Sequence, residues 1–135
     1  MILVDTSVWI DFLTGRKTPH RREFHRLIEM GIDLALSGII LQEILQGIHS
    51  DLERHRTEKY LLEFRYLTLR EPQIFHRAAD IYRECAKKGK KIRKPVDALI
   101  AAQAMEANAV LFHHDRDFDS IAALSPLKIH KIPPE

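Results

Sequence analysis

Directly after Met1 the sequence reads Ile2-Leu3-Val4-Asp5-Thr6-Ser7, three apolar residues followed by an acid and two hydroxyl side chains. A short apolar run that ends in a polar, turn-forming cluster predicts a buried strand. Asp5 would then stand at the carboxyl end of that strand, which is the edge of an open α/β sheet where ligands bind. Because buried acids are rare without a partner, we expect Asp5 to act together with other polar groups.

Apolar runs and helical patterns alternate along the rest of the chain. This alternation predicts an α/β fold whose strands pair in parallel through right-handed crossovers. No repeat, low-complexity segment or linker interrupts the pattern, so we expect a single domain over residues 1–135. The expected strands cover residues 2–5, 32–36, 65–69, 109–112 and 127–132, and the main helices cover residues 7–13, 19–30, 39–48, 51–64, 72–88 and 96–108.

The composition excludes several classes of protein. The 135 residues are 45% hydrophobic and 30% charged, which suits a packed core with a solvated surface. The formal net charge of +2 gives no indication of a partner. Cys85 is the single cysteine, so an intrachain disulfide and a cysteine-rich zinc site are excluded. We see no signal-peptide pattern and no apolar run of about 18 residues, and we therefore expect a cytoplasmic protein without membrane contact.

Three further acids occupy positions comparable to that of Asp5. Asp115 follows the fourth expected strand, Glu43 borders the apolar stripe of a helix, and Asp97 lies in the first turn of another. If the first and fourth strands are neighbours, all four carboxylates would face one cleft. Each acid also has a purely structural interpretation: Asp97 could complement a helix dipole and Asp115 could cap a helix. Asp5 is the hardest to explain in that way.

Four carboxylates in one cleft indicate a bound cation. Their mutual repulsion would keep some of them protonated unless a cation neutralised them. Hard oxygen ligands select Mg²⁺ or Mn²⁺ over softer metals. Such an ion lowers the pKa of a bound water and polarises a phosphoryl group. The acids therefore predict phosphodiester hydrolysis with one or two metal ions and without a covalent nucleophile.

A basic run lies just before Asp97. Its sequence is Lys87-Lys88-Gly89-Lys90-Lys91-Ile92-Arg93-Lys94. A bare run of charge is usually a solvated loop. Its position beside a candidate metal ligand favours another interpretation, in which its cations hold the phosphates of a nucleic acid. We assign this role to Lys90, Lys91, Arg93 and Lys94.

Four segments together resemble the PIN-domain ribonucleases, and within them the VapC toxins of bacterial and archaeal toxin–antitoxin pairs. The segments occur in the order of the family, and the chain has its usual length. They are Val4-Asp5-Thr6-Ser7-Val8-Trp9-Ile10-Asp11, Leu41-Gln42-Glu43-Ile44-Leu45-Gln46-Gly47, Pro95-Val96-Asp97-Ala98-Leu99-Ile100-Ala101-Ala102 and Leu111-Phe112-His113-His114-Asp115-Arg116-Asp117-Phe118.

The resemblance implies a fold, an activity and a set of site residues. The fold would be a three-layer α/β/α arrangement with a central parallel sheet of about five short strands. The activity would be that of an endoribonuclease dependent on Mg²⁺ or Mn²⁺. The acidic quartet of the family falls on Asp5, Glu43, Asp97 and Asp115. Supporting roles fall on Thr6 or Ser7, which would orient a carboxylate or a metal-bound water, and on Asp117 as a secondary acid. Asp11 also matches, and we interpret it as structural.

The resemblance also implies partners. Members of this family commonly form homodimers, and a cognate VapB-like antitoxin commonly holds them inactive by inserting a C-terminal segment near the acidic cleft. One departure from the family is His113-His114, where a small or hydroxyl residue is more common. We expect both histidines to be exposed, because adjacent residues in a turn seldom point at one metal ion.

Two other functions fit parts of the sequence. The first is a non-catalytic module that binds RNA or a protein partner, with acids that are only structural. The second is an aspartate-based phosphatase of the haloacid dehalogenase type, which also begins with a strand followed by Asp. That class needs a second Asp two residues after the first, and this chain has Ser7 there.

Overall fold

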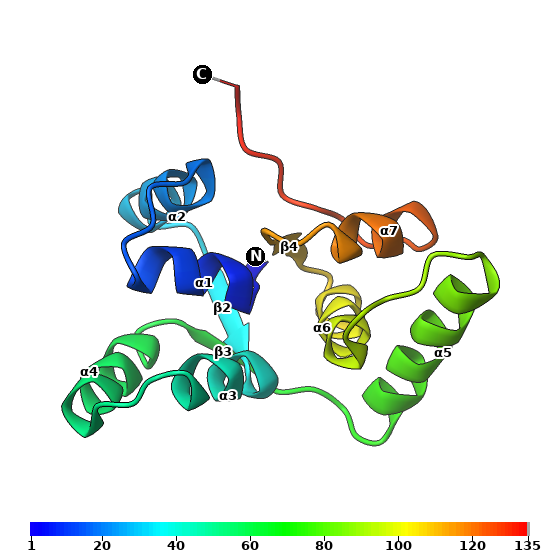
Figure 1. Cartoon of the computed structure of the whole chain (residues 1–135), viewed down its shortest axis with the longest axis horizontal. Coiled ribbons are helices and arrows are strands. Elements are labelled where there is room, and N and C mark those ends of the chain that lie inside the picture. The colour runs from blue at the N-terminus through cyan, green and yellow to red at the C-terminus, as the bar shows by residue number, and fades with distance from the viewer. Residues whose placement is uncertain (135) are drawn as a thin grey trace.

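The computed structural model describes residues 1–134 and contains a parallel sheet flanked by helices (Figure 1). The strands are β1 (Ile2–Val4), β2 (Leu34–Ser37), β3 (Arg65–Leu67) and β4 (Val110–Phe112). The helices are α1 (Thr6–Leu13), α2 (Pro19–Glu29), α3 (Gly38–Gln46), α4 (Asp51–Leu61), α5 (Gln73–Lys87), α6 (Pro95–Glu106) and α7 (Asp117–Ala123). The expected α/β class and parallel pairing are confirmed.

The order of the strands in the sheet is β3-β2-β1-β4. Leu3 in β1 pairs with Ala35 in β2 on one side and with Leu111 in β4 on the other, and all pairings are parallel. The chain builds the sheet from β1 outward to β3 and then returns to the other side of β1 to form β4. Such a change of direction opens a crevice at the carboxyl ends of β1 and β4. The expected adjacency of the first and fourth strands is therefore confirmed.

The prediction of a fifth strand over residues 127–132 is wrong. This segment makes a single bridge, between Ile129 and Leu111, in which Leu111 N–H donates to the Lys128 carbonyl and His130 N–H donates to the Leu111 carbonyl. Only Leu127 of the segment is buried in the core. One bridge at the edge of β4 satisfies too few backbone groups to extend the sheet. The sheet thus has four strands where about five were expected.

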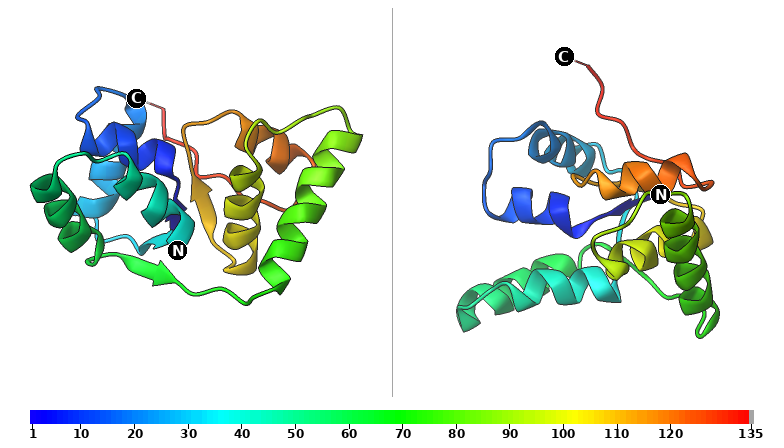
Figure 2. Two further views of the ribbon diagram at one scale, coloured as in Figure 1. Left: turned by 60° about the horizontal axis from the view of Figure 1, so that its bottom comes forward. Right: turned by 45° about the vertical axis from the view of Figure 1, so that its right-hand side comes forward.

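Helices cover both sides of the sheet. In Figure 1, α1, α2 and α4 lie on the left and α5, α6 and α7 lie on the right, with the strands between them. Both views of Figure 2 keep α5 and α6 together on the side away from α2 and α4. Small side chains let α6 pack closely against its neighbours. Ala98, Ala101 and Ala104 are at most 1% exposed.

Aromatic rings hold α1 in place on the opposite side. Trp9 is fully buried, and its ring meets those of Phe24 and Phe64 edge to face at centroid distances of 4.7 and 5.0 Å. This geometry is the favoured one for aromatic pairs in a core. Because Thr6, Ser7 and Asp11 belong to the same helix as Trp9, the packing of this one ring also positions the polar groups that follow β1.

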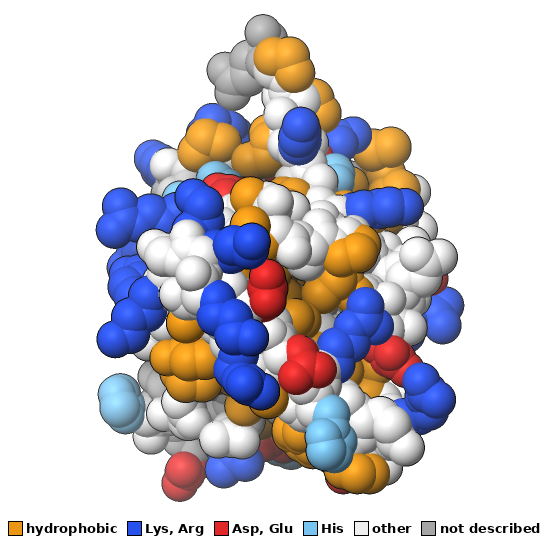
Figure 3. Space-filling model, turned by 90° about the vertical axis from the view of Figure 1, so that its right-hand side faces the viewer, with side chains coloured by type: hydrophobic (Ala, Val, Ile, Leu, Met, Phe, Trp, Pro, Cys, Tyr) orange, Lys and Arg blue, Asp and Glu red, His pale blue; other side chains and the backbone are white. Residues whose placement is uncertain are grey.

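Across residues 1–134, no helix is long and apolar enough to cross a membrane. Charged side chains are spread over the surface. On the face that α5 presents, Lys and Arg side chains surround a smaller number of acidic ones (Figure 3). Lys87, Lys88, Lys90 and Lys91, from the end of α5 and the loop after it, are exposed.

Candidate active site

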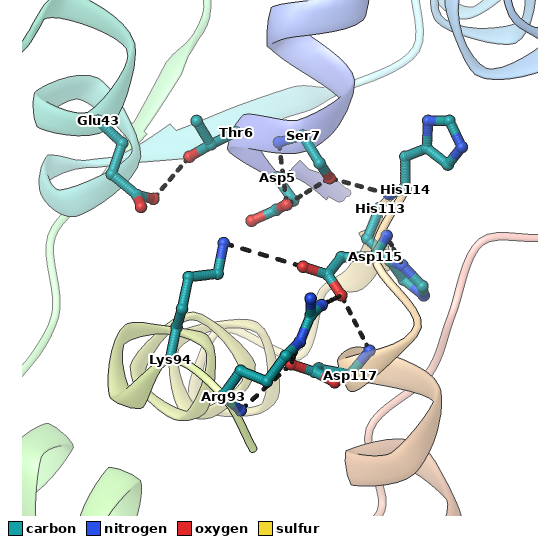
Figure 4. Close-up of polar contacts among 10 residues, drawn as sticks. All are labelled: Asp5, Thr6, Ser7, Glu43, Arg93, Lys94, His113, His114, Asp115 and Asp117. Carbon is teal, nitrogen blue, oxygen red and sulfur yellow. Dashed lines mark hydrogen bonds and ion pairs between the residues drawn. The ribbon is translucent and has the colours of Figure 1, made fainter. Parts of the chain in front are cut away.

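The four predicted acids lie around the crevice between β1 and β4, and Figure 4 shows three of them, Asp5, Glu43 and Asp115. Asp5 directly follows β1, and Asp115 lies three residues after the end of β4. Asp97 lies in the first turn of α6, and Glu43 lies in α3. Two of the acids thus follow the carboxyl ends of adjacent parallel strands, and the other two lie in helices.

Asp5 is held by its own local structure. It is 4% exposed, and one carboxylate oxygen accepts hydrogen bonds from Ser7 N–H at 3.0 Å and from Ser7 Oγ at 2.5 Å. These bonds make Asp5 the N-cap of α1. Burial raises the pKa of Asp5, and the bonds from Ser7 oppose that effect. The side chain is therefore oriented by the cap and is poorly solvated in its charged form.

Asp97 has an unsatisfied carboxylate oxygen. The residue is 2% exposed, and its Oδ2 is shielded from water without a hydrogen-bond partner among the described residues. Burial raises the pKa of Asp97 to about 7; the Lys94 ammonium acts against this shift, and the neighbouring acids Asp5, Asp115 and Asp117 add to it. A buried oxygen without a partner is costly, and a bound cation is one arrangement that would satisfy it.

Asp115 and Asp117 lie against Asp97. One carboxylate oxygen from each of these three acids lies within 4.8 Å of the other two. Asp117 N–H also donates to Asp115 Oδ1 at 3.0 Å, which closes a tight turn at the start of α7. Asp117, which the resemblance gave only a secondary role, thus belongs to the tightest acidic group, whereas Asp5 and Glu43 flank that group.

The Glu43 side chain is held by a hydrogen bond from Thr6 on α1. Thr6 Oγ1 donates a hydrogen bond of 2.7 Å to Glu43 Oε1, and Glu43 is half-buried. Thr6 and Ser7 therefore bind different acids, since Thr6 holds Glu43 and Ser7 holds Asp5. Sequence reasoning predicted a supporting hydroxyl at Thr6 or Ser7, and the structure gives each of them a carboxylate to orient.

The basic run divides into two parts. Arg93 donates to Asp115 Oδ1 at 2.9 Å and to Asp117 Oδ2 at 3.0 Å, and Lys94 Nζ lies 3.8 Å from Asp115 Oδ2. Lys90 and Lys91 are exposed and form no ion pair within residues 1–134. Arg93 and Lys94 thus offset part of the negative charge of the acidic cleft, while the two lysines before them face solvent. Sequence reasoning did not predict the contacts of Arg93 with the acids.

The two adjacent histidines point to opposite sides of the chain (Figure 4). His113 is buried, and its Nδ1 accepts a hydrogen bond from Asp115 N–H at 3.0 Å, so the expectation that it is exposed is wrong. Packing against Phe118 explains its burial. His114 is exposed, as expected, and its backbone N–H donates to Ser7 Oγ at 2.9 Å. The two rings do not converge on one site.

Comparison with known proteins agrees with this fold and site. A sequence model described as the PIN domain matches residues 2–124. Ribonuclease VapC11 of Mycobacterium tuberculosis is 33% identical over 129 residues, which cover 95% of this chain and 96% of that protein.

Solved structures give the same result. VapBC-1 from nontypeable Haemophilus influenzae has a TM-score of 0.74 at 25% identity and covers 96% of this chain and 97% of that one. A toxin–antitoxin complex from Klebsiella pneumoniae has a TM-score of 0.71 at 26% identity, with coverage of 96% and 100%. The chain therefore belongs to the PIN-domain family, and within that family it groups with the VapC ribonucleases.

Proposed function

We propose that this protein is a metal-dependent endoribonuclease toxin that hydrolyses RNA phosphodiester bonds in the acidic cleft. The observation that carries the proposal is the buried, unsatisfied carboxylate oxygen of Asp97, which faces a group of acids at the sheet's change of direction. The family supports the activity, because VapC11 is itself named a ribonuclease. A cation bound among these acids would give the Asp97 oxygen a partner.

The donor set fits Mg²⁺ or Mn²⁺. Asp5, Asp97, Asp115 and Glu43 would hold the ion, with Asp117 in support, and all of these donors are carboxylate oxygens. Once bound, the ion would supply a water of lowered pKa and polarise the phosphoryl group. Burial raises the pKa of Asp5 and of Asp97, and the charge of a bound ion would lower both pKa values.

The protein's own residues would position these acids and accept a proton. Ser7 fixes the orientation of Asp5, and Thr6 fixes that of Glu43. One of the carboxylates would take the proton from the attacking water, as a general base must lie within hydrogen-bond reach of that water. The two hydroxyl residues would thus act through the carboxylates that they orient.

The basic run would bind the RNA backbone. Lys90 and Lys91 face solvent beside the cleft, where they would contact phosphates on the flank of the cleavage site. Arg93 and Lys94 would contact phosphates nearer to the acids, with which they already pair. Phosphate and carboxylate are alternative partners of a guanidinium, so the ion pairs of Arg93 can exchange as RNA enters.

We further propose that the protein acts in the cytoplasm, forms a homodimer and is neutralised by a cognate VapB-like antitoxin. The similarity to VapBC-1 and to the Klebsiella pneumoniae complex supports the antitoxin, because both structures are toxin–antitoxin assemblies. Expression of this chain alone should arrest growth, and co-expression with a neighbouring small open reading frame should relieve the arrest. Arrest that no neighbouring gene relieves would contradict the assignment of an antitoxin.

The activity is tested by RNA cleavage with purified protein. We expect cleavage with Mg²⁺ or Mn²⁺ and none with a chelator present. Asp5→Asn should reduce the rate by about 100-fold or more, because several kcal/mol of transition-state stabilisation depend on the ion that Asp5 would hold. Asp80→Asn, which changes an exposed acid on α5, is the matched control and should cleave like the parent. Equal cleavage by the parent and Asp5→Asn would refute the proposal.

The same variants separate this function from a non-catalytic binding module. A module with structural acids would bind RNA in the parent and in Asp5→Asn alike, would cleave it in neither, and would not bind Mg²⁺ or Mn²⁺ at millimolar concentration. For a metal-dependent enzyme, we expect Asp5→Asn to lose both ion binding and RNA cleavage.

A further inference from the structure

A second group of side chains whose atoms can ligate a metal lies outside the acidic cluster. It consists of Asp11 from α1, His20 from α2 and His114 from the segment after β4, which we call the histidine cluster. One candidate ligand atom from each residue lies within 4.8 Å of the other two. The three residues come from positions far apart in the sequence, so the fold has brought them together.

The contacts inside the histidine cluster are close. Asp11 Oδ2 lies 2.7 Å from His114 Nδ1, and the rings of His20 and His114 stack at a centroid distance of 3.8 Å with 13° between their planes. Thr18 Oγ1 donates to the same Asp11 oxygen at 3.2 Å, and Arg16 Nη1 lies 3.9 Å from Asp11 Oδ1. The Asp11 side chain is 4% exposed, whereas that of His114 is 45% exposed, so the cluster is anchored on one side and open on the other.

One atom of the cluster lacks a partner. His20 Nδ1 is shielded from water and makes no hydrogen bond within residues 1–134. A shielded ring nitrogen without a partner has a desolvation cost that a bound ion or a water would remove. Burial also lowers the pKa of His20, and His114 adds to this effect, which favours the neutral imidazole that metals bind.

We propose that Asp11, His20 and His114 form a binding site for a first-row transition-metal ion of the Zn²⁺ class, separate from the Mg²⁺ or Mn²⁺ site. Two imidazole nitrogens and one carboxylate match the three protein ligands of many Zn²⁺ sites, with water in the fourth position. Imidazole also selects against Mg²⁺, which prefers oxygen ligands. The two sites would therefore hold different ions in one protein.

Binding requires two local changes. The metal takes the position of the hydrogen between Asp11 Oδ2 and His114 Nδ1; a neutral His114 then carries its ring hydrogen on Nε2, and a protonated His114 releases one proton to solvent. The stacked rings must also open, because each imidazole binds a metal in its own plane. His114, with its half-exposed side chain, can turn while Asp11 and His20 stay anchored in their helices.

The site has a direct connection to the acidic cleft. His114 N–H donates to Ser7 Oγ, and Ser7 Oγ donates to Asp5 Oδ2. A metal held by Asp11, His20 and His114 would fasten α1, α2 and the end of β4 to one another around this chain of hydrogen bonds. Occupation of the histidine cluster therefore stabilises the arrangement that positions Asp5.

The test is calorimetric titration of the full chain with Zn²⁺ in a large excess of Mg²⁺, which competes with Zn²⁺ for the carboxylates of the cleft. We expect one Zn²⁺ per chain in the parent. His20→Gln and Asp11→Asn should each weaken binding at least tenfold. The matched control is His25→Gln, which changes an exposed histidine on the same helix and should bind Zn²⁺ like the parent.

Several outcomes would overturn the proposal. These are the absence of Zn²⁺ binding in the presence of Mg²⁺, unchanged binding in His20→Gln, and equal loss of binding in His25→Gln. Asp11 is buried, so the Asp11→Asn result counts only for protein that circular dichroism shows to be folded. His20 is only partly buried, and its folded variant decides the question alone.

Discussion

Replacing Asp97 by Asn should stabilise the metal-free protein at high pH. The folded protein holds the pKa of Asp97 at about 7, compared with an ordinary value of 3.8. Ionisation of this group therefore opposes folding, and the stability of the parent should fall as the pH rises from about 4 to about 7. Asn has nearly the same shape and carries no charge, so it should remove this penalty.

The size of the effect follows from the shift in pKa. Three pKa units correspond to about 4 kcal/mol, which is an upper limit because the cleft is open to water and to counterions. We expect a gain of about 1–2 kcal/mol at pH 8, or about 4–8 °C in unfolding temperature for a chain of this size. At pH 5 about a third of the gain should persist, since most of the parent's Asp97 is then protonated in the folded state.

The assay is urea denaturation of the parent and Asp97→Asn in a chelator at pH 8 and pH 5. Asp80→Asn, on the exposed face of α5, controls for the loss of one negative charge. In saturating Mg²⁺ the order should reverse at pH 8, because only the parent would gain stability by binding the ion. Two results would refute this reasoning. One is an Asp97→Asn variant less stable than the parent in chelator at pH 8, and the other is a gain in stability of the same size at pH 5 and pH 8.

Three further perturbations test the core, the positioning of Glu43 and the RNA surface. Trp9→Ala should destabilise the protein by about 3–5 kcal/mol in urea denaturation, because a fully buried ring is lost; a change below 1 kcal/mol would contradict its role in the core. Thr6→Val should slow RNA cleavage by about 10- to 100-fold, and Thr6→Ser should restore most of it, because only the hydroxyl orients Glu43; equal rates for Val and Ser would disprove that role. Lys90→Ala combined with Lys91→Ala should lower the salt dependence of RNA binding by a slope of about 1.4, and an unchanged slope would exclude these lysines from contact with phosphate.

The sequence predicts well the strands and turns that carry the site, because these elements depend on local patterns. The apolar run before Asp5 predicts β1, and the alternation of strands and helices predicts a parallel sheet. The turn after β4 places Asp115 at the same edge. These features require only periodicity and the rule that parallel strands end on one side of a sheet.

The contacts within the site depend on tertiary geometry, which periodicity does not predict. The pairing of Arg93 with Asp115 and Asp117 joins residues 22 and 24 positions apart, across α6 and β4. The burial of His113 follows from its packing on Phe118 in the next helix. The expected strand over residues 127–132 has suitable side chains, but it reaches β4 through a single bridge.

The spacing of residues in the sequence also gives no sign of the histidine cluster. Asp11 and His20 are nine positions apart, and His114 is more than ninety positions further on. Only the docking of α2 beside the end of β4 brings them together. The sequence favours a structural role for Asp11 and gives no sign of its close contact with His114.

The central claim is that the acids at the ends of β1 and β4 hold the divalent ion on which RNA cleavage depends. The most direct test is the electron paramagnetic resonance signal of free Mn²⁺ during titration of the parent, Asp5→Asn and Asp80→Asn at pH 8, with RNA cleavage followed in the same samples. The account predicts that the parent and Asp80→Asn bind Mn²⁺ and cleave RNA, and that Asp5→Asn loses both properties together. Mn²⁺ binding and cleavage by Asp5→Asn at the level of the parent would contradict it.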